Sequence, residues 1–223
     1  MIESTVHVLR IDAIVDERER PAVAEAARQL GTCLSRASDA TWRVDVRFRG
    51  DFAAIDSNDA AAVLIVSLLP ELQSVQEPIA STQMRWQRRL SSLPGDPPPQ
   101  ILICTIFRHV AMDASNAVDA RAAIRERIRR LDLMALELSH DTGGIVVDID
   151  RALSHVGART LQTDYRLAGE RAASAVGHVI ASSVLAAALD AVVTAEVQER
   201  AAQGHGQLRD FVDSLAASAT TTR

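Results

Sequence analysis

Lysine is absent from this sequence, so all 24 of its Lys and Arg side chains are arginines. Without lysine the chain cannot form a Schiff base, use a lysine general base, or hold a nucleotide through the lysine of a phosphate-binding loop. Arginine binds carboxylates and phosphates through paired hydrogen bonds, but it does not act as a base. Mechanisms that need a lysine amine are therefore excluded.

Aromatic residues are also scarce. They make up 3% of the chain, and the net charge at pH 7 is −5. Nucleic-acid sites depend on basic surfaces and on rings that stack on bases, so we expect no nucleic-acid partner. The low aromatic content also weakens the case for a stacking platform for sugars.

Metal and cofactor signatures are lacking as well. The two cysteines, Cys33 and Cys104, have no metal-ligand spacing, and the six histidines show no His-x-x-x-His pattern. Gly143 and Gly144 precede a predicted strand instead of following one, so they do not form a dinucleotide-binding loop. We expect two buried free thiols, no metal and no cofactor.

No stretch of about 18 apolar residues occurs without an interrupting charge, which argues against a membrane span. The N-terminal residues do not form a basic segment followed by an apolar one, so no signal peptide is recognised. We expect a cytoplasmic location.

What the chain has is a regular alternation of strand and helix patterns. Apolar or alternating runs predict strands at 6–11, 41–48, 61–67, 100–107 and 145–149. Helical periodicity predicts helices at 16–34, 73–90, 115–139, 169–203 (where the pattern allows a break) and 207–217. The strict alternation at 41–48 is typical of a strand at a sheet edge.

This alternation predicts an α/β fold, a three-layer α/β/α sandwich around a five-stranded, mostly parallel, flavodoxin-like sheet. We predict one domain over residues 1–203, followed at 204–223 by a short C-terminal helix and a frayed tail.

Arginines recur along the predicted helix at 115–139. A solvated outer face is the favoured interpretation, and an anion-binding ridge is the alternative. The residues are Arg121, Arg125, Arg127, Arg129 and Arg130.

Open parallel sheets bind ligands at the carboxyl ends of their strands. The polar residues expected there are Asp12, Arg49, Asp51, Glu71, Arg108, His109, Asp148, Asp150, Asp164 and Arg166. Asp12, His109 and Asp164 could converge as a general base with orienting carboxylates. The alternative, which we favour for any single acid, is that it caps the following helix or turn.

The segment from 100 to 181 resembles SGNH/GDSL hydrolases. "ILICTIF" is similar to a core strand of that family, "GGIVVDIDRAL" to its last strand and turn, and "GHVIA" to its final helix. "TDYRL" falls at the Asp-x-x-His loop, so the resemblance implies that Asp164 matches the catalytic Asp. The residue three positions later is Leu167 where the family has His.

The resemblance also implies where the other catalytic groups belong. Asp12 and Ala13 would match the Asp and the nucleophilic Ser of the Gly-Asp-Ser motif, and the oxyanion loop, 67–71, has neither Gly nor Asn. A shifted alignment brings Ser4, Ser35 or Ser67 into consideration, but none lies in a nucleophile elbow.

We therefore expect a pocket without an evident nucleophile. Its candidate residues are Asp12, Ala13, Glu71, Arg108, His109, Asp164, Arg166 and Leu167. The favoured hypothesis is a non-catalytic or impaired SGNH-like protein that binds a protein partner or a small acylated or carbohydrate ligand, in polysaccharide or acyl-group metabolism.

Two other hypotheses stay open. One is a divergent esterase or acyltransferase with a relocated base, His109 or Asp164. The other is a flavodoxin-like interaction module, in which the alanine-rich helix that begins near residue 169 supports a homodimer.

Overall fold

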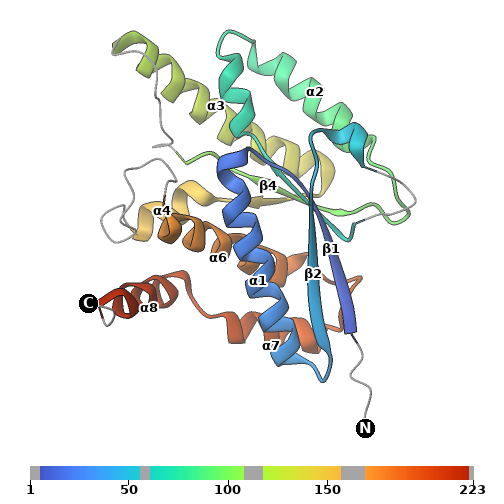
Figure 1. Ribbon diagram of the computed structural model, residues 1–223. Coiled ribbons are helices and arrows are strands. Elements are labelled where there is room, and N and C mark those ends of the chain that lie inside the picture. Colours follow the sequence, from blue (N-terminus) through green and yellow to red (C-terminus); the bar gives the residue numbers. More distant parts are fainter. Residues whose placement is uncertain (1–5, 56–60, 108–117, 157–168, 221–223) are drawn as a thin grey trace.

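Five parallel strands form one sheet in the order β2-β1-β3-β4-β5. The computed structural model describes residues 6–55, 61–107, 118–156 and 169–220 (Figure 1). The strands are β1 (Val6–Ile14), β2 (Thr41–Phe48), β3 (Val63–Ser67), β4 (Gln100–Cys104) and β5 (Ile145–Val147). The predicted fold class is confirmed, and the strand expected at the edge, β2, lies there.

Helices cover both faces of the sheet (Figure 1). One face packs against α1, α4, α6, α7 and α8, and the other against α2 and α3. The bounds are α1 (Arg20–Ala37), α2 (Ile79–Ser91), α3 (Val118–Thr142), α4 (Ile149–Val156), α6 (Glu170–Ala187), α7 (Ala195–His205) and α8 (Leu208–Thr220). Short 3-10 helices are η1 (Glu17–Glu19), η2 (Phe52–Ala54) and η4 (Leu69–Ser74).

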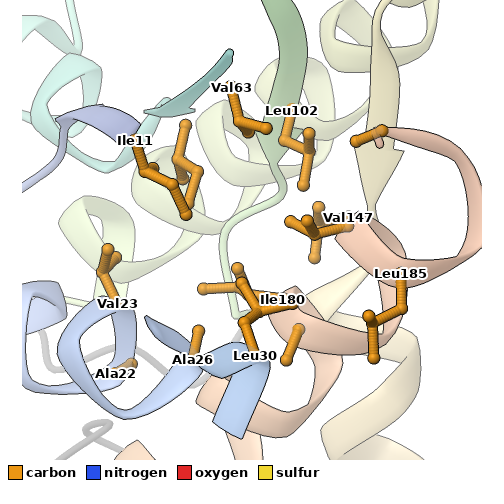
Figure 2. Close-up of a cluster of buried hydrophobic side chains, with 14 of the residues drawn as sticks. Ile11, Ala22, Val23, Ala26, Leu30, Val63, Leu102, Val147, Ile180 and Leu185 are labelled. Atoms are coloured by element: carbon orange, nitrogen blue, oxygen red, sulfur yellow. The ribbon is translucent and has the colours of Figure 1, made fainter. Parts of the chain in front are cut away.

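The core on the α1 face explains why the central strands are uniformly apolar. Every residue of β3 is buried, because helices cover it on both sides. Figure 2 shows side chains from four strands meeting α1 and α6 at this core. Fully buried Leu and Ile side chains such as Leu30 and Ile11 each contribute about 1.5–3 kcal/mol to folding.

On the other face, α3 packs through an apolar stripe in which Ile128, Leu131 and Leu138 are buried. One arginine of its expected solvated face is buried as well. Arg127 Nη1 donates to the Glu77 carbonyl oxygen at 2.7 Å, and Nη2 donates to Thr82 Oγ1 at 2.9 Å. Arg127 therefore holds α3 against the start of α2, while Arg125, Arg129 and Arg130 are exposed as predicted.

Several predicted boundaries were wrong; the strand predicted at 100–107, for example, ends at Cys104. The first strand continues to Ile14, beyond the predicted residue 11, because β2 and β3 both pair with its last residues. The break that the pattern allows within the helix predicted at 169–203 is present, and it separates α6 from α7 at 188–194. The β-branched Val192, Val193 and Thr194 lie in this break, and the Thr194 side chain accepts from the Val197 N–H to cap α7.

The C-terminal helix α8 packs against α6, and its Val212 is buried in the same core cluster. The predicted domain boundary at residue 203 stays a prediction. Within the described ranges, no helix is long and apolar enough to cross a membrane.

Candidate functional site

The carboxyl edge of the sheet brings together the turn after β1 and the last residue of β3. A capping box forms this turn: the Asp16 side chain accepts from the Arg18 N–H, and the Glu19 side chain accepts from the Asp16 N–H. Asp16 also pairs with the Arg18 guanidinium at 2.8 Å. The capping box fixes the direction in which α1 leaves the sheet.

Glu19 turns inward from this capping box and meets Ser67. The Ser67 hydroxyl donates to Glu19 Oε1 at 2.7 Å and accepts from the Leu69 N–H at 3.1 Å. Both side chains are buried, with exposed fractions of 8% for Glu19 and 1% for Ser67. Burial raises the pKa of Glu19 to about 7, because the loss of solvation outweighs the hydrogen bonds from Ser67 and Asp16.

Cys104 ends the neighbouring strand β4 and is paired in register with Ser67. Burial raises the pKa of the Cys104 thiol, and the Glu19 carboxylate nearby raises it further. A thiol in this environment is a poor nucleophile. Both cysteines are free and buried, as predicted.

Asp12 lies inside β1. The prediction that it follows the strand was wrong, because the strand continues to Ile14. Its carboxylate accepts from Arg47 Nε at 2.8 Å and from Arg49 Nε at 2.9 Å, and its exposed fraction is 1%. Successive strand residues point to opposite faces, so Asp12 faces the α2 side while Ala13 is fully buried on the α1 side. Asp12 is thus on the opposite face of the sheet from Glu19.

Glu71 is buried in η4, the 3-10 helix that follows β3. Its Oε1 accepts from Trp86 Nε1 at 2.8 Å, and its Oε2 accepts from Arg85 Nη2 at 2.5 Å. The carboxylate therefore ties η4 to α2.

Capping is confirmed for two other acids at this edge. Asp148 accepts from the Arg151 N–H at 2.9 Å at the start of α4, and Asp51 accepts from the Ala54 N–H at 3.1 Å in η2. The remaining pocket candidates lie outside the described residues, so the predicted pocket stays a prediction. They are Arg108, His109, Asp164, Arg166 and Leu167.

A second polar cluster lies between α1, α6, α7 and α8. Its residues are far apart in the sequence, and no sequence pattern links them. His178 stacks between His205, at 3.9 Å between ring centroids, and Phe211, at 4.5 Å. His205 Nδ1 lies 3.5 Å from Cys33 Sγ, and His205 Nε2 lies 3.2 Å from the His178 carbonyl oxygen. Burial, together with the neighbouring His205, lowers the pKa of His178 to about 4.

His205 follows a long alanine-rich segment, and a sequence pattern does not show that it folds back onto α6. In the part of the chain that the structure describes, no group of three or more His, Cys, Asp or Glu side chains is placed to hold a metal ion.

A groove of about 660 Å³ runs between α1 and the edge strand β2. Small α1 residues, Ala24, Ala27 and Gly31, form one wall, and Val44 and Val46 of β2 contribute to the other. This groove is along the side of the sheet, away from the Glu19–Ser67 pair.

No family model matches the chain, and no curated protein matches it in sequence. Solved structures do resemble it. LAE5, an α/β hydrolase enzyme from the metagenome of Lake Arreo in Spain, matches with a TM-score of 0.51 at 15% identity, over 81% of this chain and 94% of that chain. At this identity the likeness concerns the fold alone, and with the sheet topology it supports the SGNH-like, three-layer α/β/α fold predicted from the sequence.

Two further structures are more distant. A candidate SGNH hydrolase from Slackia heliotrinireducens has a TM-score of 0.44 and 13% identity, over 80% of this chain and 100% of that chain. Phospholipase A1 from Streptomyces albidoflavus has a TM-score of 0.35 and 12% identity, over 67% of this chain and 83% of that chain.

Proposed function

We propose that this protein is a non-catalytic SGNH-like domain that acts as a binding or accessory factor. The observation that carries the proposal is the end of β1 and the turn after it, where the resemblance puts the nucleophile, at Ala13. From Ile11 onward the first Ser, Thr or Cys is Thr32, in the fourth turn of α1. No shift of the alignment within this turn supplies a hydroxyl or a thiol.

The Glu19–Ser67 pair supports the same proposal. The only hydroxyl described at the end of β3 is nearly inaccessible, and Glu19 and the Leu69 N–H occupy it from both sides. A nucleophile must reach the carbonyl carbon of its substrate, and a nearby donor pair must stabilise the oxyanion. Ser67 instead links η1 to the start of η4, which is a structural role.

The class of ligand is part of the same proposal. A protein partner, or a small acylated or carbohydrate ligand in polysaccharide or acyl-group metabolism, fits a domain that keeps the hydrolase architecture without its nucleophile. The cytoplasmic location expected from the sequence belongs to this proposal, and cell fractionation tests it.

The experiment is a comparison of hydrolysis and covalent labelling. Purified protein is incubated with short-chain aryl esters and with a fluorophosphonate probe, beside a serine esterase as the positive control. We expect background ester turnover and no labelled band. Turnover well above background, or stoichiometric labelling, would overturn the proposal.

A second candidate function is a divergent esterase or acyltransferase, and the specific observation in its favour is the pKa of Glu19. A carboxylate with a pKa of about 7, at 2.7 Å from a serine hydroxyl, has the basicity of a general base. If labelling occurs, Ser67→Ala should abolish it and Glu19→Gln should slow it at least tenfold. His109→Ala and Asp164→Asn test the bases proposed from the sequence; loss in these variants, with Ser67→Ala fully active, removes Ser67 from the mechanism.

A further inference from the structure

The edge strand β2 has an open side along its carboxyl-terminal half. Its eight residues pair only with β1 among the described strands, and neither proline nor glycine interrupts it. The Arg49 N–H donates to the Ala13 carbonyl oxygen at 2.9 Å. In a parallel ladder this means that odd-numbered residues of β2 direct their main-chain groups to β1. Even-numbered residues direct theirs to the open side.

Helix α1 covers the first of these outward-facing residues. The Trp42 N–H donates to Ser35 Oγ at 2.8 Å, and the Trp42 carbonyl oxygen lies against Gly31. Further along the strand, no hydrogen bond is found on the open side, among the described residues, for the main-chain groups of Val44, Val46 and Phe48. A long edge that lacks the usual protection by proline or a bulge is a template for another strand.

Apolar side chains accompany this open edge. Val44, Val46 and Phe48 face the groove of about 660 Å³ beside α1, and Phe48 has an exposed fraction of 37%. The opposite wall, on α1, includes the small residues Ala24 and Ala27, which permit a close approach, together with Arg28. An added strand would therefore gain main-chain hydrogen bonds and bury apolar area at the same place.

We propose that β2 is a homodimer interface, in which two copies pair antiparallel about Val46. In this register Val46 lies opposite the partner's Val46, and Val44 lies opposite the partner's Phe48. These pairs use the three outward-facing residues that α1 leaves uncovered, and they form about six main-chain hydrogen bonds. On the other face, Asp45 lies opposite the partner's Arg47, one of two arginines that share the single buried carboxylate of Asp12, so a net positive group faces a carboxylate twice across the twofold axis.

Other registers are worse on charge or on access: centring the pair on Arg47, for example, places two arginines opposite each other. Centring the pair on Asp45 places two carboxylates opposite each other and Arg43 opposite the partner's Arg47. Centring it on Val44 requires the main-chain groups of Trp42, which Ser35 and Gly31 cover. In the Val46 register Arg43 meets the partner's Arg49; Arg43 pairs with Asp45 of its own strand, and Arg49 shares Asp12 with Arg47, so this like-charge contact is only partly offset. Self-complementarity of this kind selects a second copy over an unrelated strand.

The test is the mass of the full chain in solution, measured by light scattering and sedimentation equilibrium up to millimolar concentration. The chain mass is 24.1 kDa, and we expect a concentration-dependent shift to twice that value. Val46→Pro removes the outward N–H but leaves the ladder with β1 intact, since proline is tolerated on the free side of an edge strand. This variant should be monomeric with an unchanged circular dichroism spectrum.

A second variant tests the register, and a third serves as the control. Asp45→Arg brings like charges together across the twofold axis and should weaken dimerisation at least tenfold, with the effect shrinking at high salt. Met84→Arg, on the exposed side of α2, should leave dimerisation unchanged. A wild-type monomer at every concentration, or a dimer that survives both Val46→Pro and Asp45→Arg, would overturn the interface. Neither result bears on the esterase test.

Discussion

At the scale of the residue, Asp12 shows how a buried charge is accommodated inside a sheet. Two guanidinium groups, from Arg47 in the next strand and from Arg49 just after it, hydrogen-bond to one carboxylate. An isolated buried carboxylate is strongly destabilising, and such partners offset the loss of hydration. The position looks like a turn residue in the sequence, because the arginines that make it tolerable are 35 residues or more away.

Asp12→Asn should destabilise the protein by about 3 kcal/mol, because it leaves the two arginines without their carboxylate. The free energy of unfolding from urea titration measures the effect. Glu126→Gln removes one partner of an exposed helical pair with Arg130 and is the matched control, with a change below about 1 kcal/mol. Equal, small effects of the two substitutions would contradict the structural role of Asp12.

At the scale of the element, the contact between α1 and α6 depends on Gly177. A Cβ atom at this position would lie 2.8 Å from the Ala22 carbonyl oxygen and 3.0 Å from the Ala26 nitrogen, both of which are main-chain atoms of α1. Glycine therefore allows the two helices to cross more closely than any other residue does. Small residues of α1, Ala22 and Ala26, form the matching surface.

Gly177→Ala should destabilise the fold by about 1–3 kcal/mol, because the two helices must separate to admit one methyl group. Gly204→Ala is the matched control within another helix, α7, where no atom lies within 4 Å of the added Cβ. Alanine there should stabilise the protein by about 0.5–1 kcal/mol through helix propensity. Thermal and urea unfolding of both variants measure the difference, and a stabilising Gly177→Ala would refute the close crossing.

Elements were predictable where one local pattern determines them. The strict alternation at 41–48 predicted β2 and its place at the edge, and the helical periodicity at 115–139 predicted α3. The end of β1 was not predictable from a local pattern, because pairing with β2 and β3 extends the strand past Asp12. The Glu19–Ser67 contact was also missed, because two residues 48 positions apart met only once the topology was known.

At the scale of the whole molecule, two buried groups give opposite pH dependences. The pKa of Glu19 is raised from 4.5 to about 7, so its contribution to stability is complete below pH 4.5 and is lost as pH rises through about 7. The pKa of His178 is lowered from 6.5 to about 4, so its contribution is complete above pH 6.5 and is lost as pH falls toward 4. Between these limits the two contributions oppose each other.

Substituting either group should therefore reveal how the other group makes the free energy of unfolding depend on pH. In Glu19→Gln the free energy of unfolding should rise with pH, relative to wild type, by up to about 1.4 kcal/mol per pH unit between pH 4.5 and 6.5. In His178→Phe, which keeps a ring between its neighbours, it should fall with pH relative to wild type by a similar amount. Urea unfolding at several pH values in this window gives the three profiles. Parallel profiles would contradict both assignments.

The pairing of α1 with α6 also affects the order in which the molecule can assemble during synthesis. Helix α1 and the helix that covers it are separated by roughly 150 residues, which takes on the order of ten seconds to translate. Until α6 leaves the ribosome, the alanine face of α1 and the apolar face of β1 have no cover from that side. The nascent chain therefore spends this interval with an aggregation-prone surface, and chaperone binding should concentrate on the first third of the protein.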